Sequence, residues 1–177
     1  RLFSRLRNWL DKGLIIKNIS LNISKITLLQ NNFEEEFESI INFYKIPKKM
    51  IEIEITESIV IPNLDKLLII INSLKQKGFN ISLDNFGTGL SSLKLIKLLP
   101  IDTIKFDRQF FSNNNIEDTS PIVTEIIDYT KKLNLKSVAV GVETEEQSEF
   151  LITSDCSMAQ GYFYYGPVSL DDFEKLL

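Results

Sequence analysis

Hydrophobic positions follow two alternating patterns along this chain. Short runs rich in Ile, Val and Phe are typical of strands buried on both faces. They predict strands at residues 19–22, 50–56, 79–84, 103–106, 137–142 and 161–164. Between these runs, apolar residues recur at helical spacing, for example at Leu64, Leu67, Ile71 and Leu74. The chain is therefore predicted to alternate between strands and helices.

Several residues mark where the predicted helices begin and end. The first dozen residues predict a helix that ends at Gly13, and Gly78 predicts a left-handed stop for the helix over 64–74. Pro121 is predicted to open a further helix. Thr144 and Gln147 have the spacing of a capping box, which predicts a helix directly after them.

Alternating strands and helices predict a parallel sheet surrounded by helices. An open doubly wound sheet is disfavoured because no glycine-rich dinucleotide loop follows the first strand. A complete barrel of eight strands takes about 250 residues. We therefore expect an α/β fold, a TIM-like (β/α) barrel that lacks its first strands, as a single domain over residues 1–177. The missing strands are expected upstream in a longer parent chain, or to be disordered or replaced.

Composition narrows the chemistry. Histidine is absent, which excludes His-based catalysis and His-ligated zinc, so any metal must be held by oxygen atoms, as Mg²⁺, Mn²⁺ or Ca²⁺ are. The net charge of −4 argues against nucleic-acid binding. Cys156 is the single cysteine, so we expect a core residue in a reducing compartment. With no signal peptide and no apolar run long enough to span a bilayer, the chain is expected to be cytoplasmic, even if its parent protein is anchored elsewhere.

Polar residues gather where the predicted strands end. In a parallel barrel this edge carries the chemistry. The residues concerned are Asn22, Glu52, Glu54, Asp84, Lys105, Asp107, Glu143 and Gln160. A buried carboxylate is costly unless it is paired or bound to a metal. A structural ion pair, for example between Glu54 and Lys105, is one interpretation, and a divalent-metal and phosphate site is the other.

Six motifs in this order and spacing resemble the EAL domain family. They are Leu21–Ser24, Glu54–Ser58, Asp84–Gly89, Lys105–Asp107, Gly141–Thr144 and Gln160–Tyr162. The resemblance covers the whole chain. It implies a barrel that binds cyclic di-GMP and, in active members, opens it to the linear dinucleotide with two divalent ions, Mg²⁺ or Mn²⁺.

The resemblance also implies roles for individual residues. Asn22, Glu54 and Asp84 resemble metal ligands, and Asn85 stands where the family has a second aspartate. Lys105 resembles the lysine that polarises the attacking water. Glu143 resembles a second catalytic residue, which supports the metal and water shell. Supporting roles fall to Glu57, Asp107 and Gln160, with Glu57 anchoring the loop after Asp84. In the family that loop also contributes to a homodimer contact, and other signalling domains are expected in the parent chain.

Three departures from the family pattern decide the interpretation. The Glu-Ala-Leu strand is absent from this chain, Asn85 replaces an aspartate, and Val140 replaces the glutamate of Ala-Glu-Gly-Val-Glu. Two negative charges are thereby lost from a site for two cations. We favour a degenerate module that binds cyclic di-GMP or regulates partner domains without hydrolysing it. The alternatives are an active phosphodiesterase and a dimerisation scaffold that binds no nucleotide.

Overall fold

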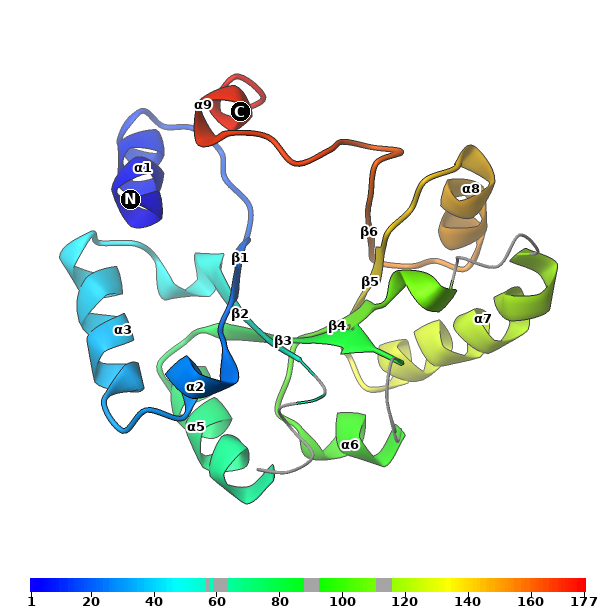
Figure 1. Cartoon of the computed structure of the whole chain (residues 1–177), viewed down its shortest axis with the longest axis horizontal. Coiled ribbons are helices and arrows are strands. Elements are labelled where there is room, and N and C mark those ends of the chain that lie inside the picture. The colour runs from blue at the N-terminus through cyan, green and yellow to red at the C-terminus, as the bar shows by residue number, and fades with distance from the viewer. Residues whose placement is uncertain (57, 59–63, 88–92, 111–115) are drawn as a thin grey trace.

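A computed structural model describes residues 1–177 except 57, 59–63, 88–92 and 111–115, and for 93–95 and 116–120 it describes the backbone alone. Within the described chain, six parallel strands pair in sequence order and form one sheet, which curls into a half-barrel (Figure 1). The strands are β1 (Ile19–Asn22), β2 (Ile51–Thr56), β3 (Asn80–Phe86), β4 (Thr103–Phe106), β5 (Lys136–Val140) and β6 (Met158–Gln160). The expected α/β barrel architecture is thus confirmed as an open, curled sheet.

Helices cover the outer, convex side of this sheet (Figure 1). They are α1 (Leu2–Asp11), α2 (Lys25–Leu28), α3 (Phe33–Phe43), α5 (Leu64–Gln76), α6 (Leu93–Leu98), α7 (Ile116–Lys132), α8 (Glu145–Thr153) and α9 (Leu170–Glu174), with the short 3-10 helices η1 (Lys48–Met50) and η3 (Arg108–Phe110). Two of the predicted helix signals are confirmed. Gly78 follows α5 with φ +92°, and Thr144 and Gln147 form a complete capping box before α8.

Alternation along the strands separates an apolar outer face from a polar inner face. On β2, Ile51, Ile53 and Ile55 are buried and belong to the hydrophobic core between sheet and helices. Phe37 of α3 packs in this layer against Phe79, with ring centroids 5.3 Å apart. Glu52 and Glu54 alternate with these isoleucines and therefore face the interior of the curl. The fold thus places carboxylates inside the half-barrel.

The sheet is open on the side where the two chain ends lie (Figure 1). Strands β1 and β6 are the two edges of the sheet, and the described residues form no ladder between them. Helices α1 and α9 meet on that side of the molecule, where the two chain ends lie close together (Figure 1). Trp9 packs on Phe173 at 5.7 Å between ring centroids, and Arg5 pairs with Asp171 and Glu174. These contacts join the first and last helices around the open side of the sheet.

Two sequence predictions about element boundaries are wrong. The last strand ends at Gln160 instead of following it, and residues 161–164 form a bend and turns. The cause is a close approach of backbones: a Cβ on Gly161 would lie 2.0 Å from the carbonyl oxygen of Val142, so the chain bends there. Tyr162 and its aromatic neighbours resemble a strand in composition but are exposed on this bend.

Pro121 does not open a helix either. Helix α7 begins at Ile116 and contains Pro121 in its interior. Proline lacks the amide hydrogen that would bond to the carbonyl four residues earlier, which is why it is usually found in the first turn of a helix. Pro121 instead lies in the second turn of α7. Separately, no helix in the described ranges is long and apolar enough to cross a membrane.

Candidate functional site

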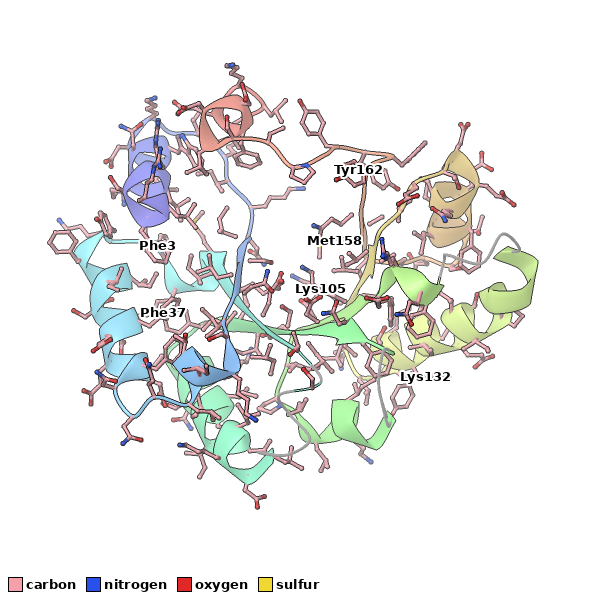
Figure 2. All side chains as sticks on the ribbon, in the orientation of Figure 1. Phe3, Phe37, Lys105, Lys132, Met158 and Tyr162 are labelled. Carbon is pink, nitrogen blue, oxygen red and sulfur yellow. The ribbon has the colours of Figure 1, made fainter. Side chains whose placement is uncertain are left out.

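A buried ion pair forms the centre of the inner face. Glu54 of β2 accepts a hydrogen bond from the Lys105 Nζ of β4, and the two side chains are 4% and 10% exposed. Lys105 projects into the interior of the curl, whereas Phe37 lies outside the sheet (Figure 2). The structural ion pair that the sequence suggested is therefore present. Removing one partner would leave an uncompensated charge in a nearly dry environment.

Glu52 lies one inward-facing position earlier on the same strand and is held differently. It is 5% exposed, and its two carboxylate oxygens accept hydrogen bonds from Ser20 at 3.0 Å and from Thr103 at 2.9 Å. The Ser20 hydroxyl comes from β1 and the Thr103 hydroxyl from β4, so the Glu52 carboxylate is held from both sides of β2. Alternation predicted where Glu52 points, but nothing in the sequence identified these partners.

Asp84 is a partly buried carboxylate at the end of β3. Burial is the largest effect and raises the pKa of Asp84 above its usual value, and the nearby carboxylates of Glu54 and Asp107 raise it further. The backbone amide of Asn85 donates to Asp84, and Lys105 lies close enough to oppose the rise. Asn85 itself is exposed and has φ +55°. Glu54, Asp84 and Lys105 therefore interact electrostatically at one end of the sheet.

Asn22 belongs to the same end of the sheet. It pairs in register with Glu54, and the backbone amide of Ile23 donates to the Glu54 carbonyl at 3.2 Å. Because β1 is an edge strand, the Asn22 side chain is exposed. The fold thus places Asn22 and Glu54 opposite each other on neighbouring strands, as two of the predicted metal-ligand positions.

The ends of β5 and β6 form a second part of the site with different character. Val140 and Gln160 pair in register there and border a hollow of about 390 Å³. The hollow is also lined by Arg108, Gly141, Glu143, Gly161, Tyr162, Tyr165, Gly166 and Pro167. Val140, at the position of the family's glutamate, therefore adds no charged group to the lining of this hollow.

Glu143 is positioned by the start of α8. Its backbone amide and that of Thr144 donate to the Gln147 side chain, at 2.7 Å and 3.2 Å. The Thr144 hydroxyl in turn accepts from the Gln147 amide. The Glu143 carboxylate remains exposed at the mouth of the hollow. A capping box thus fixes the backbone from which this predicted catalytic residue projects.

Arg108 is a site residue that sequence reasoning missed. It follows Asp107, whose side chain accepts from the Gln109 amide at 2.9 Å and so caps η3. A Cβ on Gly141 would lie 2.5 Å from the Arg108 Cβ, and Gly141 has φ +85°. This close approach brings η3 against the end of β5. The glycine-containing motifs of the sequence do not indicate this contact, because it depends on how the sheet curves.

Some predicted residues lie outside the described residues. They are Glu57 and residues 88–89 of the Asp84–Gly89 motif, which belong to the loop expected to shape a dimer contact. Their predicted roles stay predictions.

The donor groups can be tested against the pair of divalent ions that the resemblance implies. Within the described residues, no three carboxylate or thiol groups converge on one point. Glu54 is engaged by Lys105, Asn85 offers an uncharged amide, and Val140 offers no donor. Two divalent ions require several oxygen ligands with negative charge. The described residues alone therefore do not fit two ions.

Comparison with known proteins gives the chain its family. A model of the EAL domain matches residues 1–167. The signalling protein YkoW of Bacillus subtilis is 33% identical over 97% of this chain, which spans 21% of that protein. The bifunctional diguanylate cyclase/cyclic di-GMP phosphodiesterase MucR of Pseudomonas aeruginosa is 35% identical over 93% of the chain, which spans 24% of it. The chain thus covers about a fifth to a quarter of these relatives.

Solved structures agree with the sequence relatives. The MucR phosphodiesterase in complex with c-di-GMP matches with a TM-score of 0.88 and 34% identity, over 97% of this chain and 70% of that one. The EAL domain of Mycobacterium smegmatis DcpA matches with a TM-score of 0.91 and 31% identity, over 99% of this chain and 79% of that one. This chain belongs to the EAL domain family.

Proposed function

We propose that this chain is a cyclic di-GMP-binding signalling module that does not hydrolyse its ligand. The observation that carries the proposal is Val140, whose apolar side chain borders the hollow beside Gln160 where family members carry a glutamate. The solved MucR relative is a c-di-GMP complex, which supports this ligand class. The relatives are much longer than this chain, which supports a role beside other signalling domains.

The loss of hydrolysis follows from charge. A two-metal mechanism needs ligands that hold both ions and activate a water molecule between them. Even a residue that only supports a metal ligand is worth roughly 10–100-fold in metal affinity or activity. Val140 and Asn85 together remove two carboxylates from positions that the family uses. We therefore expect binding of the ligand to outlast its hydrolysis.

An active phosphodiesterase is the second candidate, and one observation favours it. Glu54, Asp84 and Lys105 remain together at the ends of β2, β3 and β4. With Asn22 in register beside Glu54, this group retains oxygen donors for one Mg²⁺ or Mn²⁺ ion. In that case slow hydrolysis through one ion would be measurable.

The test is a pair of measurements on the intact protein with Mn²⁺ or Mg²⁺. Calorimetry measures the binding of cyclic di-GMP, and chromatography measures its conversion to the linear dinucleotide. We expect saturable binding and no turnover above the protein-free control. Robust turnover would refute the degenerate function in favour of the enzyme. Absence of both binding and turnover would leave the scaffold, with the homodimer contact after Asp84 as its proposed interface.

A further inference from the structure

We propose that Arg108 directly binds a phosphate group of a nucleotide in the hollow between η3, β5 and β6, without a metal ion. The inference rests on the proposed function and deepens it, because it names the residue that supplies positive charge where the chain has lost metal ligands. Arg108 lies in η3, directly after the strand that carries Lys105. It is the one cation among the described residues that line this hollow.

The backbone fixes where Arg108 stands. Gly141 allows the Arg108 backbone and Cβ to lie against the end of β5, since any Cβ at position 141 would come within 2.5 Å of the Arg108 Cβ. Asp107 caps the first turn of η3 through the Gln109 amide. The side chain of Arg108 is therefore anchored at its base, while its exposed guanidinium remains available to the hollow.

The positive charge of the Arg108 guanidinium is not paired within the described part of the chain. In the described part of the chain, Arg108 makes no hydrogen bond or ion pair. Among the residues that line the hollow, Glu143 is the one carboxylate, and it is exposed at the mouth in front of α8. Val140, beside Gly141, brings no carboxylate to the lining that could pair with the guanidinium. The substitution therefore removes a negative charge from this corner, which makes an anion more favourable there than it would be beside a glutamate.

Aromatic rings in the same hollow select a nucleotide over free phosphate. Tyr162 and Tyr165 line it and are 73% and 58% exposed. Tyr162 lies on the segment between β6 and α9 (Figure 2). The Tyr162 ring packs along Gly166, since a Cβ there would lie 3.3 Å from a ring carbon. A flat apolar ring held this way stacks on a nucleobase. Arginine matches the oxygen geometry of a phosphate with paired N–H donors.

The test compares two variants that each remove one positive charge. Arg108→Gln removes the proposed phosphate donor, and Lys132→Gln removes an exposed charge at the end of α7, away from the hollow. Cyclic di-GMP binding is measured by calorimetry on the intact protein with EDTA present. We expect binding by the wild type without metal, loss of roughly tenfold or more in affinity for Arg108→Gln, and no change for Lys132→Gln.

Two further variants separate a phosphate contact from a folding defect. Arg108→Lys keeps the charge without the paired donors and is expected to retain part of the affinity. Val140→Glu is expected to weaken metal-free binding, because the new carboxylate competes for the guanidinium. Thermal unfolding of each variant verifies that it is folded. Equal affinities for Arg108→Gln and Lys132→Gln in EDTA would overturn the proposal, as would binding that requires a divalent ion.

A second probe keeps this inference distinguishable from the proposed function. If the wild type does not bind cyclic di-GMP, the proposed function fails, and GMP then serves as the probe in NMR titrations. GMP binding that depends on Arg108 would support the phosphate contact on its own. If neither nucleotide produces a response that Arg108→Gln abolishes, the inference is wrong.

Discussion

The polar residues at the carboxyl ends of the strands form two groups, one in each half of the site, that differ in burial and in charge pairing. At the ends of β2, β3 and β4, Glu54 and Lys105 form a buried pair and Asp84 lies nearby with a raised pKa. At the ends of β5 and β6, Val140 and Gln160 border a hollow whose charged groups, Arg108 and Glu143, are exposed. In the first half the charged groups interact with one another, whereas in the second half exposed charged groups lie in the same lining as the apolar side chain of Val140.

The contrast indicates which positions tolerate substitution. A buried ion pair resists loss of either partner, because the remaining charge is left desolvated. A partly buried position at the rim of a hollow, such as Val140, can exchange a carboxylate for valine at little cost to folding. We infer that stability preserves the Glu54–Lys105 pair of the first half. At position 140, in the second half, only a function with metal ions would preserve a carboxylate.

Breaking the ion pair should have the largest effect on stability. Lys105→Met leaves Glu54 buried without a counter-charge, and we expect the free energy of unfolding to fall by about 3–5 kcal/mol. Urea denaturation measures the change. The double variant Glu54→Gln with Lys105→Met removes both charges and should recover most of the loss. A double variant as unstable as Lys105→Met alone would show that the ion pair is not the cause.

Disturbing the close contact between η3 and β5 should have an intermediate effect. Gly141→Ala places a methyl group against the Arg108 Cβ in a backbone with φ +85°, and we expect a loss of about 1–3 kcal/mol. Gly13→Ala is the matched control, because Gly13 has φ +75° and open space around it. The control should lose only about 1 kcal/mol from backbone strain. Equal losses in urea denaturation would contradict the proposed packing of Arg108.

Neutralising Asp84 should have the smallest effect, visible as a change in pH dependence. Burial raises the pKa of Asp84, so the folded protein holds that proton more tightly than the unfolded chain does. In metal-free buffer this contribution to stability is present at low pH and is lost as pH rises through the raised pKa. Asp84→Asn should therefore be slightly more stable than the wild type at about pH 7, with the gap closing towards about pH 4. A gap that widens on acidification would show that the pKa is lowered.

The sequence predicted the parallel sheet because strand composition and helix punctuation are local properties. Its failures have non-local causes. Residues 161–164 have the composition of a strand, but the contact between Gly161 and the Val142 backbone turns the chain there. Pro121 was expected at a helix start and lies inside α7.

The site could be predicted in part for the same reason. Strand alternation placed Glu52 and Glu54 on one face, and the ion pair with Lys105 was one of two interpretations. The hydroxyl partners of Glu52 and the position of Arg108 depend on how the sheet curls, which brings residues from separate strands together. Spacing along the chain carries no information on that curvature.

We infer that a site with Asn85 on β3 and Val140 on β5 no longer holds two metal ions. Mn²⁺ titration of the intact protein, followed by electron paramagnetic resonance, tests it most directly. We expect at most one bound Mn²⁺ ion per wild-type chain, and an additional ion in the double variant Asn85→Asp with Val140→Glu. Two tightly bound Mn²⁺ ions in the wild type, with affinities that the double substitution leaves unchanged, would contradict it.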